Sequence, residues 1–245
     1  MKPDKVNIPM APIQLLDHGI VRLVEHMGSD LSIARNARVS YDAAWRAGED
    51  EGSDTRLINY LWKNGHTSPF EAVSLTFEIK APIFVFRQWH RHRIGWSYNE
   101  LSARYRELPE EFYVPTAVNV GIQSKDNKQA RVTDMSMTAE ELHERQVACD
   151  MIWMCASSSF KMYRELLKRG VPRELARSVL PVAVYSHMFA TCNLHSLFKF
   201  CVLRLHSHAQ YEIRVYAEAM LKLAEAVCPV AVKAFKIHTM GEGSA

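Results

Sequence analysis

Residues 73–106 read VSLTFEIKAPIFVFRQWHRHRIGWSYNELSARYR, and this stretch contains the main signals for the fold. Its first ten residues alternate apolar and polar side chains from Val73 to Ile79, the period of two that is typical of a half-buried strand. Pro82 then opens an apolar run that predicts a helix. Arginines and histidines follow directly after that run, so a polar segment leaves the predicted core at this point.

Patterns on both sides of this stretch predict an α+β fold, with an antiparallel or mixed sheet flanked by helices and a long helix in the second half. Apolar alternation predicts two short strands around Gly19 in residues 13–27 and a further strand at 182–193. Helices are expected at 31–41, 55–65, 138–170, 173–180, 194–205 and 209–227. We find no repeat and no linker, so residues 1–245 are expected to form one domain.

Several short motifs mark the expected helix ends. The pair Ser53–Asp54 is expected to cap the helix that ends at Gly65. The segments Ser68–Glu71 and Thr138–Glu141 each fit a capping box, in which the first and last side chains bond each other's backbone. The chain after the last helix, which is expected to stop at Cys228–Pro229, has no such signal.

Three segments lack regular patterning. Residues 116–137 are polar and irregular and are expected to form a long surface loop. Residues 1–10 and 237–245 are expected to be flexible tails.

Composition excludes several classes of protein. The chain has 245 residues, 48% of them hydrophobic and 23% charged, which is ordinary for a globular protein. No apolar run approaches the ~20 residues that cross a bilayer, and residues 1–10 lack the apolar core of a signal peptide. The net charge of +3 is too small for a nucleic-acid coat protein. Five scattered cysteines without a CxxC motif indicate a reducing, cytoplasmic setting.

The segment Arg87–Arg106 is the densest cluster of cationic side chains. Its five arginines are Arg87, Arg91, Arg93, Arg104 and Arg106, and tryptophan and tyrosine are interleaved with them. Arginine matches phosphate and carboxylate oxygens, and the repulsion between like charges is relieved when an anion lies among them. We therefore predict an anion site with a flat ring beside it. The alternative is a solvated basic face.

Two further arginines lie among apolar residues. Arg204 has apolar neighbours on both sides, and an unpaired guanidinium buried there would cost several kcal/mol. The alternative is a helix-end arginine that reaches solvent. For Arg177 the alternative is an ion pair with Glu174. The close histidine pairs, His90 with His92 and His206 with His208, do not form a closed zinc set, so no metal is expected.

The motif itself resembles a known family. RHR at Arg91–Arg93, followed after eight residues by Ser102 within SYNELSARY, is similar to the signature of the flavin-dependent thymidylate synthases (ThyX). HTSPFE at 66–71, APIFVFRQW at 81–89, VPRELARSVLP at 171–181, CNLHSL at 192–197 and HAQYE at 208–212 also resemble that family. The resemblance extends from about Ile13 to Phe235.

This resemblance implies a homotetramer with active sites shared between subunits. Such enzymes convert dUMP to dTMP with FAD as cofactor, and with NADPH and 5,10-methylenetetrahydrofolate as co-substrates, without a cysteine nucleophile. Nucleic-acid and membrane partners are not implied.

The resemblance also assigns residues to ligands. FAD contacts are implied for Ser68, Arg91, His92, Arg93, Glu100 and Asn193, with His195 and Lys199 as further candidates where the family often has arginine and asparagine. Contacts to dUMP are implied for Gln88, Arg91, Glu100, Leu101, Ser102, Ala103, Arg104, Arg177 and Arg204. Arg204 is the catalytic candidate, because it matches the arginine that favours ionised N3 of uracil.

Two other functions remain open at this stage. A single-strand nucleic-acid binder would use the arginines and aromatic rings of Arg87–Arg106, but it leaves Arg177 and Arg204 unexplained. A flavoprotein that methylates tRNA uridine would be expected to carry a dinucleotide-binding glycine motif, and the sequence has none.

Overall fold

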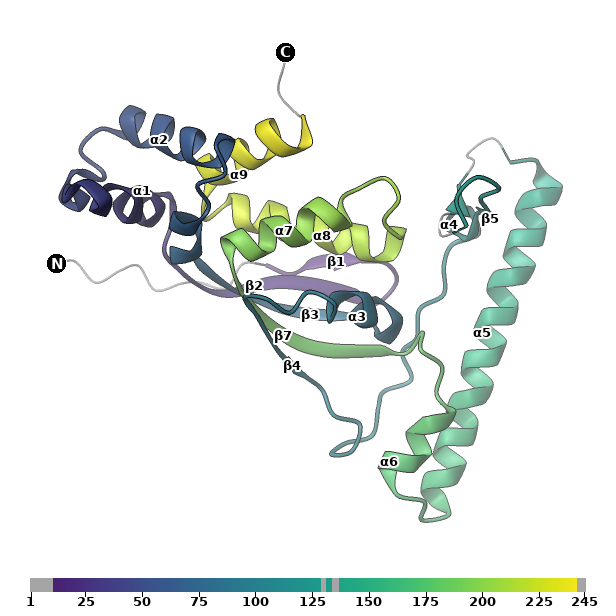
Figure 1. Cartoon of the computed structure of the whole chain (residues 1–245). Coiled ribbons are helices and arrows are strands. Elements are labelled where there is room, and N and C mark those ends of the chain that lie inside the picture. Colours follow the sequence, from purple (N-terminus) through teal and green to yellow (C-terminus); the bar gives the residue numbers. More distant parts are fainter. Residues whose placement is uncertain (1–10, 129–130, 134–136, 242–245) are drawn as a thin grey trace.

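A computed structural model describes residues 11–128, 131–133 and 137–241 of the chain. Its centre is a five-stranded antiparallel sheet in the order β1-β2-β3-β7-β4 (Figure 1). The strands are β1 (Ile13–Leu15), β2 (Gly19–Met27), β3 (Ser74–Pro82), β4 (Trp96–Glu100) and β7 (Tyr185–Asn193). The predicted α+β class with an antiparallel sheet is confirmed.

The central strand β3 explains why the sheet forms here. Its alternate residues Leu75, Phe77 and Ile79 are fully buried, as the period of two requires. Phe77 lies opposite Leu23 of β2 on one side and Ala190 of β7 on the other. Burial of each large apolar side chain contributes about 1.5 to 3 kcal/mol, so this face anchors the core.

Helices from the second half of the chain cover that face. These are α7 (Leu194–Arg204) and α8 (Tyr211–Glu225), and α3 (Ile83–Trp89) follows β3 directly. The last α-helix, α9 (Pro229–Phe235), packs on α8 and α2. Figure 1 shows α7 and α8 side by side over the sheet, and α8 contacts β2 and α3. The end of α7 and the end of α3 are thereby brought together.

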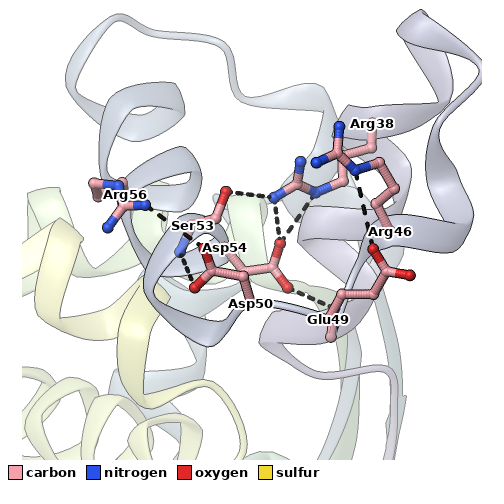
Figure 2. A network of polar contacts seen from close by, with 8 residues as sticks. Arg38, Arg46, Glu49, Asp50, Ser53, Asp54 and Arg56 are labelled. Carbon is pink, nitrogen blue, oxygen red and sulfur yellow. Dashed lines mark hydrogen bonds and ion pairs between the residues drawn. The ribbon is translucent and has the colours of Figure 1, made fainter.

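A polar network joins the two helices near the N-terminus, α1 (Asp30–Arg38) and α2 (Glu51–Lys63). Arg38 donates to the Asp54 carboxylate from Nε at 3.0 Å and from Nη2 at 2.6 Å (Figure 2). The same carboxylate accepts from the backbone N–H of Gly48 at 2.7 Å. Asp54 is only 8% exposed, so these bonds offset the cost of burying its charge. Between the helices lie two 3-10 turns, Val39–Tyr41 and Ala44–Arg46.

The long helix α5 (Ala139–Lys168) lies to one side of the sheet (Figure 1). It begins at the predicted capping box, in which Thr138 Oγ1 accepts from the N–H of Glu141 at 3.2 Å. Phe160 and Tyr163 of α5 pack with Phe112 in a second, smaller core. The neighbouring elements are α4 (Ala117–Val120), β5 (Ile122–Gln123), β6 (Arg131–Val132), α6 (Arg173–Ala176) and the 3-10 turn Arg177–Val179.

Part of α5 exposes large apolar side chains. Its exposed members include Val147, Met151, Ile152, Trp153, Met154 and Met162. Steps of three and four from Cys149 through Ile152 to Ala156 predict that Ile152 lies in the core, but it is 38% exposed. No helix among the described residues is long and apolar enough to cross a membrane.

Two predicted caps are wrong. Asp50, and not Ser53 or Asp54, caps α2, because its side chain accepts from the N–H of Ser53 at 3.1 Å. Ser68–Ala72 is a 3-10 turn whose N-cap is Thr67, without a capping box. Glu71 instead pairs with His195 at 3.2 Å, a contact across 124 positions that local sequence cannot reveal.

Two predictions on irregular segments also need correction. The expected loop 116–137 contains α4 and the two-stranded sheet β5–β6 in its described part. Pro229 does not end the helical part of the chain, since α9 and a π-helical turn at Lys236–Met240 follow it, and the tail expected at 237–245 is helical as far as Met240. Trp62 Nε1 donates to Thr239 at 2.9 Å, which holds that turn on α2. The predictions for 1–10 and for 242–245 lie outside the described residues.

Candidate active site

Arg204, the last residue of α7, is the centre of the candidate site. Its Nε donates to His92 Nε2 at 3.0 Å. Its Nη2 donates to the backbone oxygen of Gln88 at 3.0 Å, and Nη1 lies 3.4 Å from Gln88 Oε1. The predicted need of this arginine for partners is confirmed, and both partner residues, His92 and Gln88, are themselves predicted site residues.

These partners leave the charge of Arg204 unneutralised. All three acceptors are neutral, and among the described residues no carboxylate forms an ion pair with Arg204. Burial lowers the pKa of its guanidinium, because the protein replaces part of the water around the cation. The site therefore favours a ligand that carries or develops negative charge beside Arg204.

His92 acts as an acceptor in this cluster. Burial, followed by the charge of Arg204, lowers the pKa of His92 to about 4. The ring is therefore neutral near pH 7, and Nε2 is free to accept from Arg204. Tyr98 of β4 donates from its hydroxyl to the His92 backbone oxygen at 2.5 Å, which fixes the turn that carries the histidine.

That turn, at residues 91–95 and called the RHR turn below, follows the end of α3 and depends on Gly95. Gly95 has φ +70°, and a Cβ there would lie 2.2 Å from Ser196 Oγ and 3.2 Å from Asn193 Nδ2. Only glycine allows the turn to approach the start of α7 this closely. Arg91 and Arg93 are exposed on the turn, and in the described part of the chain neither guanidinium group has a hydrogen bond or an ion pair.

Further candidate FAD contacts lie at and near the start of α7. Asn193 is the N-cap, and its Oδ1 accepts from the N–H of Ser196 at 2.7 Å. His195 Nδ1 lies 3.2 Å from Glu71 Oε1, which ties the 3-10 turn that begins at Ser68 to α7. Ser68 and Lys199 are exposed. The structure thus brings the RHR turn, the Ser68 turn and the start of α7 into one region.

A second group of predicted residues lies at and after the end of β4. Glu100 accepts from Ser186 Oγ at 2.6 Å and lies 3.8 Å from His90 Nε2. The N–H of Leu101 donates to the backbone oxygen of His187 at 2.7 Å. Ser102 Oγ accepts from the N–H of Arg104 at 3.3 Å, and Ala103 between them is buried.

Glu174 of α6 connects Arg104 to Arg177. Its carboxylate lies 3.3 Å from Arg104 Nε, and its backbone oxygen accepts from Arg177 Nε at 3.3 Å. The alternative ion pair between Arg177 and the Glu174 side chain is therefore wrong, because that carboxylate faces Arg104. A hollow of about 250 Å³ is lined by Arg104, Tyr105, Pro172, Arg173 and Glu174.

The Arg104 group (Arg104 and Arg177) and the Arg204 group (Arg204, His92 and Gln88) remain separate within one chain. No hydrogen bond or ion pair between described residues joins Arg104 or Arg177 to Arg204, His92 or Gln88. Figure 1 agrees, since α6 lies beside α5 and away from the ends of α3 and α7. The described residues also contain no group of three or more His, Cys, Asp or Glu placed to hold a metal ion.

Gln210 and Glu212 lie near the site but had no predicted role. Gln88 Nε2 donates to Gln210 Oε1 at 2.5 Å, and Gln210 Nε2 donates to Glu212 Oε2 at 2.8 Å. Glu212 is 1% exposed. A glutamate in the first turn of a helix is ordinary, so the sequence carries no signal for its burial.

Comparisons with known proteins agree with this geometry. A family model described as "Thymidylate synthase complementing protein" matches residues 22–230. A "Flavin-dependent thymidylate synthase" of Thermosipho africanus is 44% identical over 222 residues, which cover 91% of this chain and 92% of that protein. A protein of the same name from Thermotoga neapolitana is 44% identical over 223 residues, covering 91% and 93%.

A solved structure is also similar. It is the UMP/dUMP methylase PolB of Streptomyces cacaoi, bound with 5-Br dUMP. The TM-score is 0.81 at 38% sequence identity, and the match covers 93% of this chain and 98% of that chain. The family model and these relatives extend over nearly the whole chain, including the RHR turn, β4 and α7. The chain therefore belongs to the thymidylate synthase complementing protein family, that is, to the flavin-dependent thymidylate synthases.

Proposed function

We propose that this chain converts dUMP to dTMP with FAD as cofactor, 5,10-methylenetetrahydrofolate as methylene donor and NADPH as reductant. The observation that carries the proposal is Arg204, a half-buried cation whose partners are all neutral. A cation held in that way stabilises negative charge on a ligand more strongly than the same cation in water.

Arg204 would act on the uracil ring. Of its five N–H groups, three have partners in the described structure, so two remain for the ring. Donation to N3 or a ring carbonyl favours the ionised ring, and the added electron density makes C5 more nucleophilic. We therefore assign Arg204 the catalytic role, with Gln88 beside it as a dUMP contact.

Other residues would bind the nucleotide. Arg104 and Arg177 supply planar forks that suit the phosphate dianion, and the Ser102 hydroxyl can donate to it. Leu101 and Ala103 shape the same turn, and Glu100 and Arg91 complete the proposed contact set. The pairing of Arg104 with Glu174 is exposed and is worth little, so a phosphate displaces it at small cost.

The residues near the start of α7 fit FAD. The exposed guanidinium groups of Arg91 and Arg93, unpaired among the described residues, match a pyrophosphate, and the close approach at Gly95 holds their turn beside Asn193. We assign FAD contacts to these residues and to Ser68, His92, Glu100, His195 and Lys199. When bound and reduced, FAD supplies the hydride, while this chain binds and orients it.

Cysteine chemistry has little support. Burial raises the pKa of the thiols of Cys192, Cys201 and Cys228, so they are protonated and poor nucleophiles. Cys155 is exposed on α5. Activation of the ring by Arg204 takes the place of thiol attack in this proposal. The free cysteines also suit the reducing cytoplasm.

A homotetramer with shared sites would explain two features. The exposed apolar side chains of α5 include Met151, Trp153 and Met154, and such a patch is typical of an interface. The Arg104 group and the Arg204 group do not meet within one chain. We propose that the Arg104 group of one subunit completes the site around Arg204 of another.

The test is dTMP formation by the purified protein with FAD, NADPH and methylenetetrahydrofolate, with dUMP and UMP as alternative substrates. We expect dUMP to be methylated, since the 44% identical relatives carry the name thymidylate synthase. Methylation of UMP at a similar rate would favour the broader UMP/dUMP methylase activity for which the similar structure is named. Absence of product from both nucleotides would contradict the proposal.

A further inference from the structure

A chain of side chains leads from the buried carboxylate of Glu212 to Arg204. Glu212 Oε1 accepts from Tyr113 Oη at 3.0 Å and from Arg131 Nη2 at 2.7 Å. Glu212 Oε2 accepts from Gln210 Nε2 at 2.8 Å. The carboxylate is 1% exposed, forms an ion pair with the Arg131 guanidinium and accepts hydrogen bonds at both oxygens.

The orientation of each amide in this chain follows from that carboxylate. An ionised carboxylate cannot donate, so Gln210 must present its NH2 group to Glu212 and its oxygen to Gln88. Gln88 then presents its own NH2 group to Gln210, at 2.5 Å, and its oxygen to Arg204. If both amides were reversed, the amide oxygen of Gln210 would face the Glu212 carboxylate. The NH2 group of Gln88 would face the Arg204 guanidinium. Only one arrangement satisfies all the partners.

The position of Gln210 supports a role beyond helix capping. Gln210 is the N-cap of α8, yet its side chain makes no capping bond. Its backbone oxygen accepts from Ile213 and Arg214, which is sufficient to start the helix. The side chain is therefore available for the contact between α8 and α3.

We propose that Gln210 and Glu212 are positioning residues that hold the Gln88 amide, and through it Arg204, in the orientation that meets the substrate. This inference rests on the proposed function, in which Gln88 and Arg204 contact dUMP. Neither Gln210 nor Glu212 touches the ring in this scheme. They prevent the Gln88 amide from reversing, which would turn its NH2 group toward Arg204.

The first test is Gln210→Met, which keeps the length of an exposed side chain and removes both hydrogen bonds. We expect kcat/KM for dUMP to fall about tenfold, while the flavin content and the Tm stay unchanged. The matched control is Gln146→Met on α5, where the amide also bonds a carboxylate, Asp150, at 2.9 Å. Gln146→Met should retain the wild-type kcat/KM.

A double-mutant cycle separates positioning from a general structural effect. If Gln210 acts only through Gln88, Gln210→Met should add nothing in a Gln88→Met background. Independent effects that multiply in the double variant would overturn the inference, as would wild-type kcat/KM in Gln210→Met.

A structural measurement distinguishes failure of this inference from failure of the proposed function. A crystal structure of Gln210→Met should show the Gln88 side chain rotated away from its 3.4 Å approach to Arg204. Unmoved Gln88 and Arg204 side chains would overturn the positioning role whether or not the wild-type protein makes dTMP. Absence of dTMP from the wild-type protein contradicts the proposed function alone.

Discussion

Arg204 donates from Nε to Nε2 of His92 at 3.0 Å, and the two residues are 112 positions apart in the sequence. The bond requires a neutral histidine, and the pKa of His92, lowered to about 4 by burial and by Arg204, provides one. The RHR turn and the end of α7 therefore depend on each other.

This relationship predicts how stability changes with pH. The pKa of His92 is about 4 in the fold and near 6.5 in the unfolded chain, so below pH 6.5 the unfolded chain takes up a proton that the fold excludes. Stability should fall between pH 6.5 and 4, by about 1 to 2 kcal/mol for this half-exposed ring. His92→Gln keeps an acceptor but does not titrate. Thermal unfolding at fixed protein concentration should show a smaller loss in that variant, and equal losses would contradict the assignment.

Removal of the Arg204 charge should stop chemistry without releasing the cofactor. In Arg204→Ala we expect dTMP formation to fall about 10²- to 10³-fold, since charge stabilisation at the ring is lost. The proposed FAD contacts near the start of α7 remain, so flavin content should match that of the wild type. Turnover assays and visible absorption check the two parts, and turnover near the wild-type rate would disprove the role of Arg204.

Arg104→Lys should weaken binding of dUMP about tenfold, because the planar fork is replaced by a point charge. Arg106→Lys is the matched control, since Arg106 is exposed in the same segment and, among the described residues, its Nε bonds only the backbone oxygen of Glu107. Titration calorimetry with the flavin-loaded protein measures both. Equal affinities of the two variants would argue against a phosphate contact at Arg104.

Gly95→Ala should release flavin. Its Cβ would lie 2.2 Å from Ser196 Oγ and would force the RHR turn away from α7. Gly65→Ala is the control: φ is +71° there, against +70° at Gly95, but apart from its chain neighbours no described residue has an atom within 4 Å of the added Cβ. Both variants bear a strain of about 1 to 2 kcal/mol, and only Gly95→Ala should lose flavin absorbance. Equal flavin content in the two proteins would show that the close approach is unimportant.

Asp54→Asn should destabilise the contact between α1 and α2. The variant leaves Arg38 with a neutral partner and places an NH2 group near other donors, at a cost of about 2 to 3 kcal/mol. Asp50→Asn should cost much less, because asparagine caps helices as well as aspartate does. Urea unfolding at one protein concentration compares them. A larger loss in Asp50→Asn would contradict the importance of the buried carboxylate.

Elements with strong local patterns were predictable from the sequence. The alternation in β3 and the capping box of α5 depend on neighbouring residues, and both were predicted. Strand β4 was not, because its apolar alternation is limited to Trp96 and Tyr98, which is too short to indicate a strand. Helix α9 was missed because Pro229 was interpreted as a stop, whereas proline also suits the first turn of a helix.

The site was predictable in its residue types but not in its contacts. A guanidinium among apolar residues implies a partner, and that prediction for Arg204 is confirmed. The identity of the partners depends on the packing of α3 against α8 and of α7 against α8, which no local pattern encodes. The same packing brings Gln210 to Gln88, so the positioning chain becomes visible only in the fold.

The most direct measurement is the visible absorption spectrum of the purified protein under anaerobic conditions with dUMP present, before and after addition of NADPH. We predict the absorption bands of oxidised flavin, and their bleaching when NADPH is added. A colourless protein that takes up no added FAD would contradict the assignment of the RHR turn and the start of α7 as a flavin site.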